Sequence, residues 1–373
     1  MPRPSLSRAL DVATRAMSSA GRPGRRAAHA LDLIGSTGVR YAWRRRRESE
    51  AVARLYPEPE DALFGDIWAR AAAAVGAELD VLGGGFYGFR RDRATGRVWR
   101  HVTSLDDAVT LRFALDKPRV QRLLRERGIP VPGWRELDLG DFAGALEFVR
   151  GGAEPCVVKP AGQSGGSGVT AGVRGERELR RALLRASRLG GRVILERQVP
   201  GNVYRLLFLD GELLDAIRRR PPTLVGNGRS TLAELVAAEN RRRMAKNGRA
   251  GLTLLYVDLE AVLTLERAGI GLGTVPAAGS QVTLKTVTSQ NRVEDNETVS
   301  VGDDLVSEAA EAVQAVGLRL AGVDLVAREP GRSLEASGGA IIEVNGTPGL
   351  HYHYLVANEA TDVAAPVLER MLG

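Results

Sequence analysis

The sequence predicts a fold of the α/β or α+β class, built from several packed units. Segments with the two-residue alternation of strands are interspersed with segments whose apolar residues recur at helical spacing. The chain has 373 residues, a length that corresponds to roughly two or three domains. Its hydrophobic content of 44% and charged content of 26% are ordinary for a globular protein. This composition excludes a disordered chain, a collagen-like fibre and a disulfide-stapled mini-protein.

The first 55 residues form a basic segment that we expect to be partly helical. Residues 1–50 contain 11 arginines, no lysine and four acidic residues, and their net charge of +7 equals that of the whole chain. The run from Arg44 to Arg47 could contact nucleic acid or an acidic membrane surface, and a solvated helix face is the alternative. The sequence around Pro57 and Pro59 marks a boundary after this segment.

The single cysteine, Cys156, excludes an internal disulfide and a multi-cysteine metal site. It lies in an apolar, strand-like segment, where we expect a buried thiol. The sequence has no run of about 18 apolar residues of the kind that spans a membrane. The N-terminus lacks the apolar core of a secretory signal, although its arginine-rich composition also resembles an organelle transit peptide. We therefore expect a cytoplasmic protein with no membrane partner.

Residues 56–115 are predicted to form a small α/β unit. Apolar residues recur at helical spacing between Phe64 and Ala77. Three short strands follow, at residues 79–82, 86–91 and 97–102, with a glycine turn before the second and a turn at 94–96 before the third.

From Lys117 onward, helices and strands alternate. A helix is expected from Lys117 to Arg127, because Gly128 and two prolines follow it. Two strands, 156–159 and 169–173, flank a glycine-rich loop. The further predicted elements are helix 176–189, strands 192–198 and 204–209, helices 232–244 and 305–316, and strands 322–326 and 340–344.

The glycine-rich loop is the first candidate site. Its glycines allow backbone amides to gather around anionic oxygens, as in a loop that folds over a polyphosphate. No Gly-Lys-Ser/Thr follows, so it is not a Walker loop, and a flexible turn is the alternative. Lysine is rare, with only four among 52 basic residues, and Lys117 and Lys159 precede the loop. We expect both to bind phosphate.

The strand that ends at Glu196 is the second candidate site. It runs into the segment 197–201, where exposed backbone N–H and C=O groups could pair with the edge of an adenine. A plain exit from a strand into a turn is the alternative.

Two apolar strands that carry polar residues form the third candidate site. The first contains Asp324, and the second places Glu343 and Asn345 on one face by the two-residue period of a strand. Three oxygen ligands on neighbouring strands suit Mg²⁺, which binds carboxylates together with phosphate oxygens. A tight turn follows, and its amides at Gly349 could face a developing oxyanion. Outward-facing acids on two edge strands are the alternative.

Taken together, these motifs resemble the ATP-grasp superfamily in their order and spacing. The segments 195–235, 275–282 and 321–324 are similar to the ATP-grasp region of cyanophycin synthetases and related amide ligases, and the resemblance covers roughly residues 105–350. It implies an ATP-grasp fold, in which two α+β subdomains clasp ATP. Together with the composition and the predicted elements, it gives four parts: the basic helical segment 1–55, a pre-ATP-grasp α/β domain at 56–115, a central lid subdomain at 116–195 and a C-terminal subdomain at 196–373.

The resemblance implies an ADP-forming carboxylate–amine ligase that uses ATP and two Mg²⁺ ions, with Mn²⁺ as an alternative. The metal ligands would be Asp324, Glu343 and Asn345. The nucleotide would be bound by Lys117, Lys159, Gly165, Gly166, Ser167, Gly168, Glu196, Val199 and Asn202. The catalytic set would be Arg205, Arg218, Lys285, Asn291 and Gly349, with the two arginines neutralising the transferring phosphoryl group and a surface arginine as the alternative for each.

The sequence departs from the cyanophycin synthetases in two places. Those enzymes carry a further ligase domain, whereas this sequence ends at Gly373, so we expect something other than a full cyanophycin synthetase. The segment 292–298 is charged where the relatives have a Ser/Gly-rich turn, which suggests a different substrate pocket. The two histidines of the segment 351–354 are only a fragment of a zinc site, and we expect them to line the acceptor pocket.

The predicted substrates are a small-molecule carboxylate and an amine, either amino acids or small peptides, in specialised-metabolite or modified-peptide biosynthesis. A homodimer is compatible with the family. One alternative is a nucleotide- or nucleic-acid-binding regulator that uses the basic arm, but the complete ligand set from Lys117 to Asn345 favours the enzyme. A second alternative keeps the enzyme and changes the acceptor to a thiol or water.

Overall fold

The computed structural model describes residues 57–138, 141–163, 166–187, 189, 192–244 and 253–373, and in addition Ile34. The predictions made for the basic segment 1–55 and for Gly165 therefore lie outside the described residues. Among the helices that are described, none is long and apolar enough to cross a lipid bilayer.

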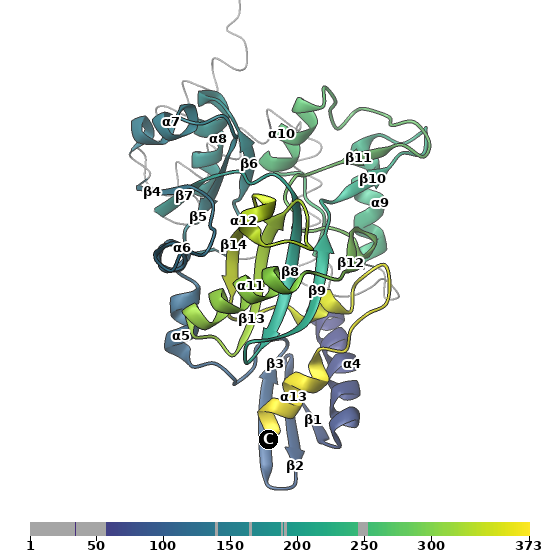
Figure 1. Cartoon of the computed structure of the whole chain (residues 1–373). Helices are drawn as coiled ribbons and strands as arrows, with labels where there is room; N and C mark the ends of the chain where they lie inside the picture. Colours follow the sequence, from purple (N-terminus) through teal and green to yellow (C-terminus); the bar gives the residue numbers. More distant parts are fainter. Residues whose placement is uncertain are drawn as a thin grey trace, which may run out of the picture.

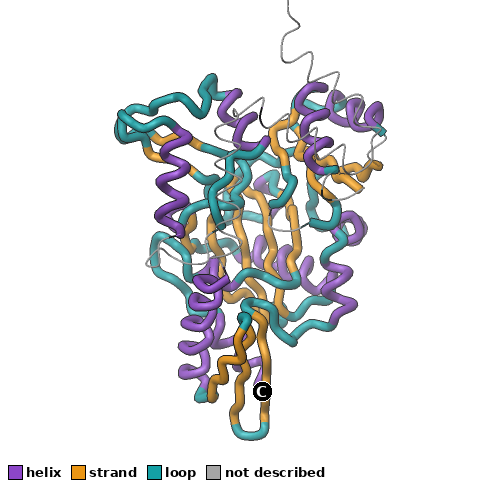
Figure 2. Tube along the Cα trace, turned by 180° about the vertical axis from the view of Figure 1, so that it is seen from behind, coloured by secondary structure: helices purple, strands orange, loops and turns teal. Residues whose placement is uncertain are grey.

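A three-stranded antiparallel sheet lies at one end of the molecule, against two helices (Figures 1 and 2). Phe64 and Trp68 from the first helix and Leu368 from the last helix are buried against this sheet. The predicted turn at 94–96 is wrong: the chain turns at Asp92, which adopts a positive φ of 54°, as short polar residues do. The unit consists of α4 (Pro57–Val75), β1 (Glu78–Gly83), β2 (Phe86–Arg91), β3 (Ala94–Trp99) and α13 (Ala364–Leu372).

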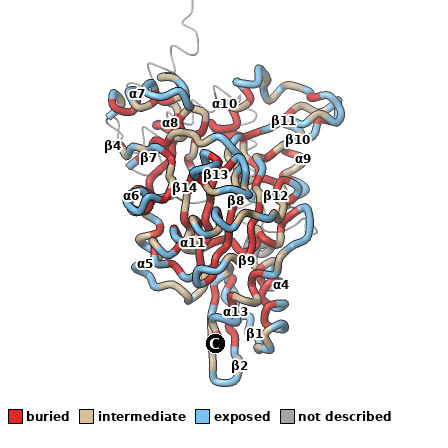
Figure 3. The backbone as a smooth tube through the Cα atoms, in the orientation of Figure 1, coloured by how far each residue is buried: buried red, intermediate tan, exposed pale blue. Residues whose placement is uncertain are grey.

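A five-stranded sheet with antiparallel neighbours forms the centre of the molecule, in the order β12-β9-β8-β13-β14. Helix α11 crosses one face of it (Figure 1), and the central strands are buried (Figure 3). The apolar core of this face includes Leu206, Leu305 and Val323. The elements are α5 (Ala108–Ala114), α6 (Lys117–Glu126), β8 (Asn202–Leu209), β9 (Glu212–Arg219), β12 (Asn296–Thr298), α11 (Asp303–Val316), β13 (Leu320–Ala327), α12 (Leu334–Ser337) and β14 (Ala340–Asn345).

A four-stranded sheet with two helices forms a separate layered unit, which we call the lid. Its strand order is β4-β7-β5-β6, and Cys156 is buried in its core as a free thiol, as predicted. The expected subdomain boundary after residue 195 falls inside β7, which pairs with its neighbours up to Arg197. The lid consists of β4 (Trp134–Asp138), α7 (Phe142–Arg150), β5 (Cys156–Pro160), β6 (Thr170–Val173), α8 (Glu176–Ala186) and β7 (Arg192–Arg197).

A fourth unit lies beside the lid and has an apolar core of its own, which includes Leu232, Val257 and Leu265. We call it the α9–α10 unit. Its elements are β10 (Thr223–Val225), α9 (Leu232–Met244), α10 (Leu259–Arg267) and β11 (Gln281–Thr283). Two short 3-10 helices complete the fold, η1 (Val293–Asp295) and η2 (Leu350–His353). Helices and strands are thus mixed along the chain, which confirms the predicted fold class.

Candidate active site

One face of the central sheet is polar, and the strand register places the predicted metal ligands on it. Asp324 of β13 lies opposite Arg205 of β8 and opposite Glu343 of β14. Asn345 lies opposite Gly322, two residues from Asp324 along the same strand. Because side chains alternate along a strand, Arg205, Asp324, Glu343 and Asn345 share one face, and their chain neighbours face the apolar core under α11.

Asp324 is the most tightly held of these carboxylates. Arg205 donates to both of its oxygens, from Nε to Oδ1 at 2.8 Å and from Nη2 to Oδ2 at 2.6 Å. Asn345 Nδ2 also donates to Oδ2, at 3.2 Å. Burial alone would raise the pKa of Asp324, but the Arg205 guanidinium outweighs burial and leaves that pKa below its usual value. Asp324 is therefore ionised at neutral pH.

The donor atoms on this face fit a Mg²⁺ ion in their chemistry. Two carboxylates and one amide oxygen are hard ligands on adjacent strands. The amide nitrogen of Asn345 donates to Asp324 and to the Gly322 carbonyl, which leaves its Oδ1 to face a cation. In the described part of the chain, no three His, Cys, Asp or Glu side chains are grouped to hold a metal ion. A metal here would thus need further oxygens, such as those of a phosphate.

Lys117, at the first turn of α6, links the lid loop to the polar face. Its Nζ lies 3.1 Å from Glu343 Oε1 and also donates to the carbonyl of Gln163. An aspartate N-cap and a proline in the first turn explain why a helix begins at this point. A crevice lies between α6 and β14, lined by Ala114, Lys117, Val120, Gln121, Leu124, Ile341, Ile342, Glu343 and Val344.

Lys159 and Glu196 form a buried ion pair at the lid side of the same region. Lys159 Nζ lies 2.5 Å from Glu196 Oε1 and 3.4 Å from the Ile342 carbonyl of β14. Glu196 also accepts a hydrogen bond from Gln121 of α6. The lid sheet, α6 and β14 therefore meet at Lys117, Lys159 and Glu196, three of the residues predicted to bind the nucleotide.

The glycine-rich loop makes two turns that require glycine. Gly166 and Gly168 have positive φ angles of 72° and 78°. A Cβ atom on Gly166 would lie 2.7 Å from the Cβ of Ser289, so the loop approaches the segment 286–291 closely. Ser167, between these glycines, is exposed, which is compatible with its predicted contact to a phosphate.

Val199 and Asn202 follow β7. Val199 is half-buried in the segment that leaves this strand, and Asn202 is exposed at the start of β8, opposite Ala327. Both lie within a few residues of Glu196, and their contacts with a nucleotide remain predictions.

Arg218 does not lie with Arg205, although both were predicted to neutralise a phosphoryl group. Arg218 is opposite Tyr204, which faces the core under α11, and its side chain pairs with Glu297 of β12. Arg219 is opposite Val203 and therefore shares the polar face with Arg205. One residue of register thus places Arg219, and not Arg218, on the face that bears Arg205. The role of Arg218 toward a phosphoryl group stays a prediction.

Lys285 and Asn291 were predicted to face the substrate, but the structure gives both of them partners within the protein. Lys285 is 1% exposed, and its Nζ lies 2.8 Å from Asp258 Oδ2 and 2.9 Å from Gln290 Oε1. Burial lowers the pKa of Lys285, although Asp258 opposes this shift. Asn291 is 2% exposed and donates to Asn296 Oδ1 at 2.6 Å. Both residues therefore hold segments of the chain together.

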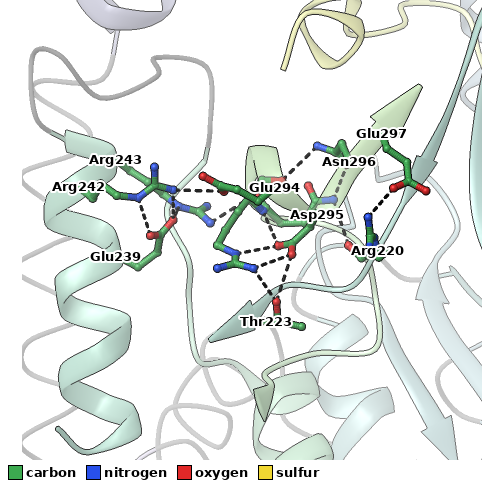
Figure 4. A network of polar contacts seen from close by, with 11 residues as sticks. Arg220, Thr223, Glu239, Arg242, Arg243, Glu294, Asp295, Asn296 and Glu297 are labelled. Carbon is green, nitrogen blue, oxygen red and sulfur yellow. Dashed lines mark hydrogen bonds and ion pairs between the residues drawn. The ribbon is translucent and has the colours of Figure 1, made fainter. Parts of the chain in front are cut away.

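The charged segment 292–298 is also used within the protein (Figure 4). Asp295 accepts hydrogen bonds from Arg292 and Thr223, and Glu297 pairs with Arg218 and Arg220. Together with further contacts from α9, this network fastens the α9–α10 unit to the edge of the central sheet. The charges expected to shape a substrate pocket thus serve to join two units.

The segment after Gly349 closes the polar face on the β9 side. The Tyr352 ring centroid lies 5.4 Å from the guanidinium carbon of Arg205 and 4.5 Å from that of Arg219. A Cβ on Gly349 would lie 2.8 Å from a ring carbon of His351, so glycine allows this segment to fold back on itself. The role of the Gly349 amide toward an oxyanion remains a prediction.

The histidines of this segment are buried beneath the polar face. His353 Nδ1 lies 2.6 Å from Asp215 Oδ2, and His351 stacks on Tyr352 with 4.1 Å between ring centroids. Burial lowers the pKa of both histidines. For His351 the nearby charges lower it further, whereas for His353 the Asp215 carboxylate opposes the shift without reversing it. Both rings are therefore neutral at pH 7.

Sequence reasoning missed Gln121 and Arg219. Gln121 lies four residues after Lys117 on α6, so helical spacing could have placed it beside Lys117. Arg219 lies in a run of three arginines, and the sequence carries no signal for which of them faces the site.

No protein-family model matches the chain. The chain is 31% identical over 261 residues to the cyanophycin synthetase of Trichormus variabilis, which covers 69% of this chain and 29% of that protein. It is 29% identical over 289 residues to the glutathione biosynthesis bifunctional protein GshAB of Enterococcus faecalis, covering 72% of this chain and 36% of that protein. The chain thus spans about a third of the length of these curated relatives.

Among solved structures, the chain is similar to a bifunctional glutathione synthetase from Pasteurella multocida. The TM-score is 0.53 at 22% sequence identity, and the match covers 84% of this chain and 44% of that chain. This similarity shows a shared fold. The predicted resemblance to cyanophycin synthetases is confirmed, as is the fold class inferred from it.

Proposed function

We propose that this chain, which has the ATP-grasp fold and is similar to cyanophycin synthetases, is an ATP-dependent carboxylate–amine ligase. It joins the carboxylate of an amino acid or small peptide to an amine and releases ADP and phosphate. The observation that carries the proposal is the convergence of Lys117, Lys159 and Glu196 beside the polar face that bears Asp324 and Glu343. Cationic groups for phosphates and oxygen ligands for a cation are thereby placed side by side.

In this proposal the nucleotide lies between the lid and the central sheet. Lys117 and Lys159 bind the α- and β-phosphates, and the glycine-rich loop closes over the β/γ end. The Glu196 side chain and the Val199 backbone bind adenine, and Asn202 contributes from the start of β8. The lid, from β4 to the end of β7, then covers the nucleotide, and the C-terminal subdomain carries the metal and substrate site.

Asp324, Glu343 and Asn345 would hold two Mg²⁺ ions, or Mn²⁺ in their place. When bound, the ions neutralise the charge of the phosphates and align them for transfer. Arg205, held in place by Asp324, adds a fixed positive charge on the same face.

The reaction proceeds in two steps. An oxygen of the substrate carboxylate attacks the γ-phosphorus, and the bond from that phosphorus to the β–γ bridging oxygen breaks, so that ADP leaves with the electron pair. The amine nitrogen then attacks the acyl carbon of the acyl phosphate, the carbon–oxygen bond to phosphate breaks, and the nitrogen loses a proton. Arg205 neutralises the transferring group, and the Gly349 amide faces the oxyanion.

Specialised-metabolite or modified-peptide biosynthesis is the setting that we propose. The homodimer and the role of the basic arm remain predictions, because neither a second chain nor that arm is described.

Product analysis tests the proposal. Purified protein with Mg²⁺ and ATP is screened over pairs of amino acids, and ADP, phosphate and the condensation product are measured together. We expect phosphate release only when a carboxylate and an amine are both present. Formation of AMP and pyrophosphate would contradict the acyl-phosphate route.

Glu343→Ala tests the metal assignment. We expect it to abolish turnover and to leave the fold intact by circular dichroism. Glu369→Ala is the matched control, because Glu369 lies on the surface of α13, away from the polar face. Turnover retained in Glu343→Ala would refute the assignment.

A further inference from the structure

The three-stranded sheet has one covered face and one open face. Helices α4 and α13 pack on the face that carries Tyr87, Phe89 and Val98, and these three side chains are buried (Figure 1). Because side chains alternate along a strand, their chain neighbours point to the other face, which we call the outer face. The strand register places three rows of residues across it, from β1 to β3. The rows are Leu82, Phe86 and Trp99; Asp80, Gly88 and Arg97; and Glu78, Arg90 and Thr95.

Every side chain of the outer face other than that of Gly88 is exposed. Leu82, Phe86 and Trp99 are 54%, 48% and 45% exposed, although they are large and apolar. The rings of Phe86 and Trp99 are stacked, with 6.1 Å between their centroids. Leu82 reaches over Gly88, since a Cβ atom on that glycine would lie 3.6 Å from Leu82 Cδ1. Adjoining apolar side chains on a protein surface are typical of a contact with another molecule.

The charges of the outer face are balanced. The edge strand β1 carries Glu78 and Asp80, whereas Arg90 lies on β2 and Arg97 on β3. Arg90 pairs with Glu78 of its own sheet, with 2.9 Å from Nε to Oε2. Neither Asp80 nor Arg97 has an oppositely charged side chain within 4 Å among the described residues. Nucleic acids and strongly acidic proteins bind to surfaces with an excess of positive charge, so this face suits a partner whose own charges are balanced.

A second copy of the same face provides the matching arrangement. β2 is the middle strand, so a twofold axis that runs along β2 between two outer faces exchanges β1 and β3. Asp80 of one copy then faces Arg97 of the other, and this contact occurs twice. The two apolar rows lie on each other and are removed from water. Each unpaired charge and each exposed apolar row thus obtains a partner.

The size of the outer face sets the strength of such a contact. Its strands have six residues each, so the face measures about 14 Å by 20 Å, or about 300 Å². A standard stable interface buries about 800 Å² on each partner. The face therefore supports a weak and reversible association, with a Kd in the micromolar range or above.

We propose that the outer face is the contact through which this chain forms a reversible homodimer, with the apolar rows at its centre and two Asp80–Arg97 pairs beside them. This assigns a surface to the homodimer that the sequence analysis left without one. The inference does not depend on the proposed function, because no residue of the outer face belongs to the candidate active site.

Sedimentation velocity of the full chain, from the low to the high micromolar range, tests for the dimer. We expect the average mass to rise from monomer to dimer with concentration. Phe86→Ser should weaken this association by about tenfold or more, since both copies lose an apolar contact. Val109→Ser is the matched control, because Val109 is 79% exposed on α5, outside the face. A wild type that stays monomeric at every concentration would overturn the inference, as would equal weakening in the two variants.

Charge exchange is the decisive experiment. Asp80→Arg and Arg97→Asp each place like charges opposite one another in the proposed dimer, so each variant alone should be monomeric. In an equimolar mixture of the two variants, positions 80 and 97 carry opposite charges at both contacts, and the dimer should reappear. A mixture that stays monomeric would contradict the inference. Packing of residues 1–55 or of an unrelated protein on this face would give no response to mixing.

Thermal unfolding supplies an independent readout. A protein that dimerises in the folded state is stabilised by mass action, so the melting temperature of the wild type should rise with protein concentration. Asp80→Arg should lose this dependence, and its circular dichroism spectrum should stay that of the wild type because the residue is exposed. A concentration dependence that survives in Asp80→Arg would place the dimer contact elsewhere on the molecule.

Discussion

The lid contacts the rest of the molecule at two junctions that are built differently. Toward the central sheet, single side chains make the contacts: Lys159 lies near the Ile342 carbonyl, Gln121 bonds to Glu196, and Lys117 donates to the Gln163 carbonyl. Toward the α9–α10 unit, a buried carboxylate accepts from an amide of a lid strand. Glu260 accepts from the Ala171 amide at 2.7 Å.

Buried charges reinforce this second junction. Arg185 of the lid lies 2.7 Å from Asp258 at the N-cap of α10, and Lys285 lies 2.8 Å from the same carboxylate oxygen. Lys159 with Glu196 lies beside the proposed nucleotide site, and Lys285 with Asp258 lies in the core between the lid and α10. The sequence alone does not distinguish these two kinds of ion pair. In the proposed function the first junction borders the nucleotide site, whereas the second joins the lid to α10.

The largest effect is expected from Lys159→Met at the first junction. The substitution removes a cation from the proposed phosphate site, where preorganised charge contributes most to phosphoryl transfer. We expect kcat/KM to fall by about 10³-fold or more, measured by coupled ADP release. The substitution also leaves the buried Glu196 without its cation, so some stability is lost as well. Circular dichroism at the assay temperature checks that the variant is folded. Activity within tenfold of the wild type would remove Lys159 from the site.

The same substitution at the second junction, Lys285→Met, should affect stability instead. It leaves Asp258 with a single buried cation, and breaking one partner of a buried pair costs about 3 kcal/mol. Urea denaturation measures this loss, and titration with Mg²⁺-ATP should give a nucleotide affinity close to that of the wild type. A loss of turnover without a loss of stability would instead return Lys285 to the catalytic set predicted from the sequence.

Acid should weaken the second junction selectively. Burial would raise the pKa of Asp258, but Arg185 and Lys285 outweigh it and hold that pKa well below its usual value. Because the folded pKa is lower than the unfolded one, the contribution of Asp258 is complete above about pH 4 and is lost as the pH falls further.

Urea denaturation between pH 3 and 7 checks this sign. We expect the wild type to lose more stability below about pH 4 than Asp258→Asn, which is destabilised at every pH. Glu260 has the opposite pH dependence. Burial raises its pKa, so its contribution to the free energy of unfolding falls as the pH rises through that pKa. Equal slopes for wild type and Asp258→Asn would contradict the assignment.

The smallest effect is expected from Arg267→Gln, at the rim of the second junction. Arg267 lies 3.1 Å from Glu178 in a partly exposed pair, and such pairs contribute about 0.2–1 kcal/mol. Its contact with the Ala171 carbonyl is 3.3 Å long. A loss of several kcal/mol in urea denaturation would show that the rim, and not the buried pair, holds the junction.

The sequence predicted which residues lie together where residue type and the two-residue alternation of strands decide their position. Lys117, Lys159, Glu196 and the Asp324 face are close together as expected. These predictions rested on two unusual combinations of residues, a lysine before a glycine-rich loop and acidic residues within apolar strands. Each combination is costly or rare unless the residues bind something. The ligand-binding roles of these residues remain to be tested.

The parts that the structure places differently from expectation depend on information that the sequence does not carry locally. Arg218 and Arg219 are chemically identical, and a register set by distant strand pairing decides which one faces the site. The family resemblance placed Lys285 in the catalytic set, but a resemblance in sequence does not distinguish a ligand contact from a core ion pair. The turn at Asp92 was misplaced because glycine at position 96 was taken as the turn residue.

The packing of α13 on α4 bears on how the protein is made. The core of the three-stranded unit combines Phe64 and Trp68 with Val367 and Leu368, which are separated by about 300 positions in the chain. During synthesis, α4 and its sheet leave the ribosome long before their partner helix exists, so their apolar faces stay open while some 270 further residues are translated. This end of the molecule therefore completes its core only after α13 is made, even though its first helix and its three strands are translated before the rest of the described fold.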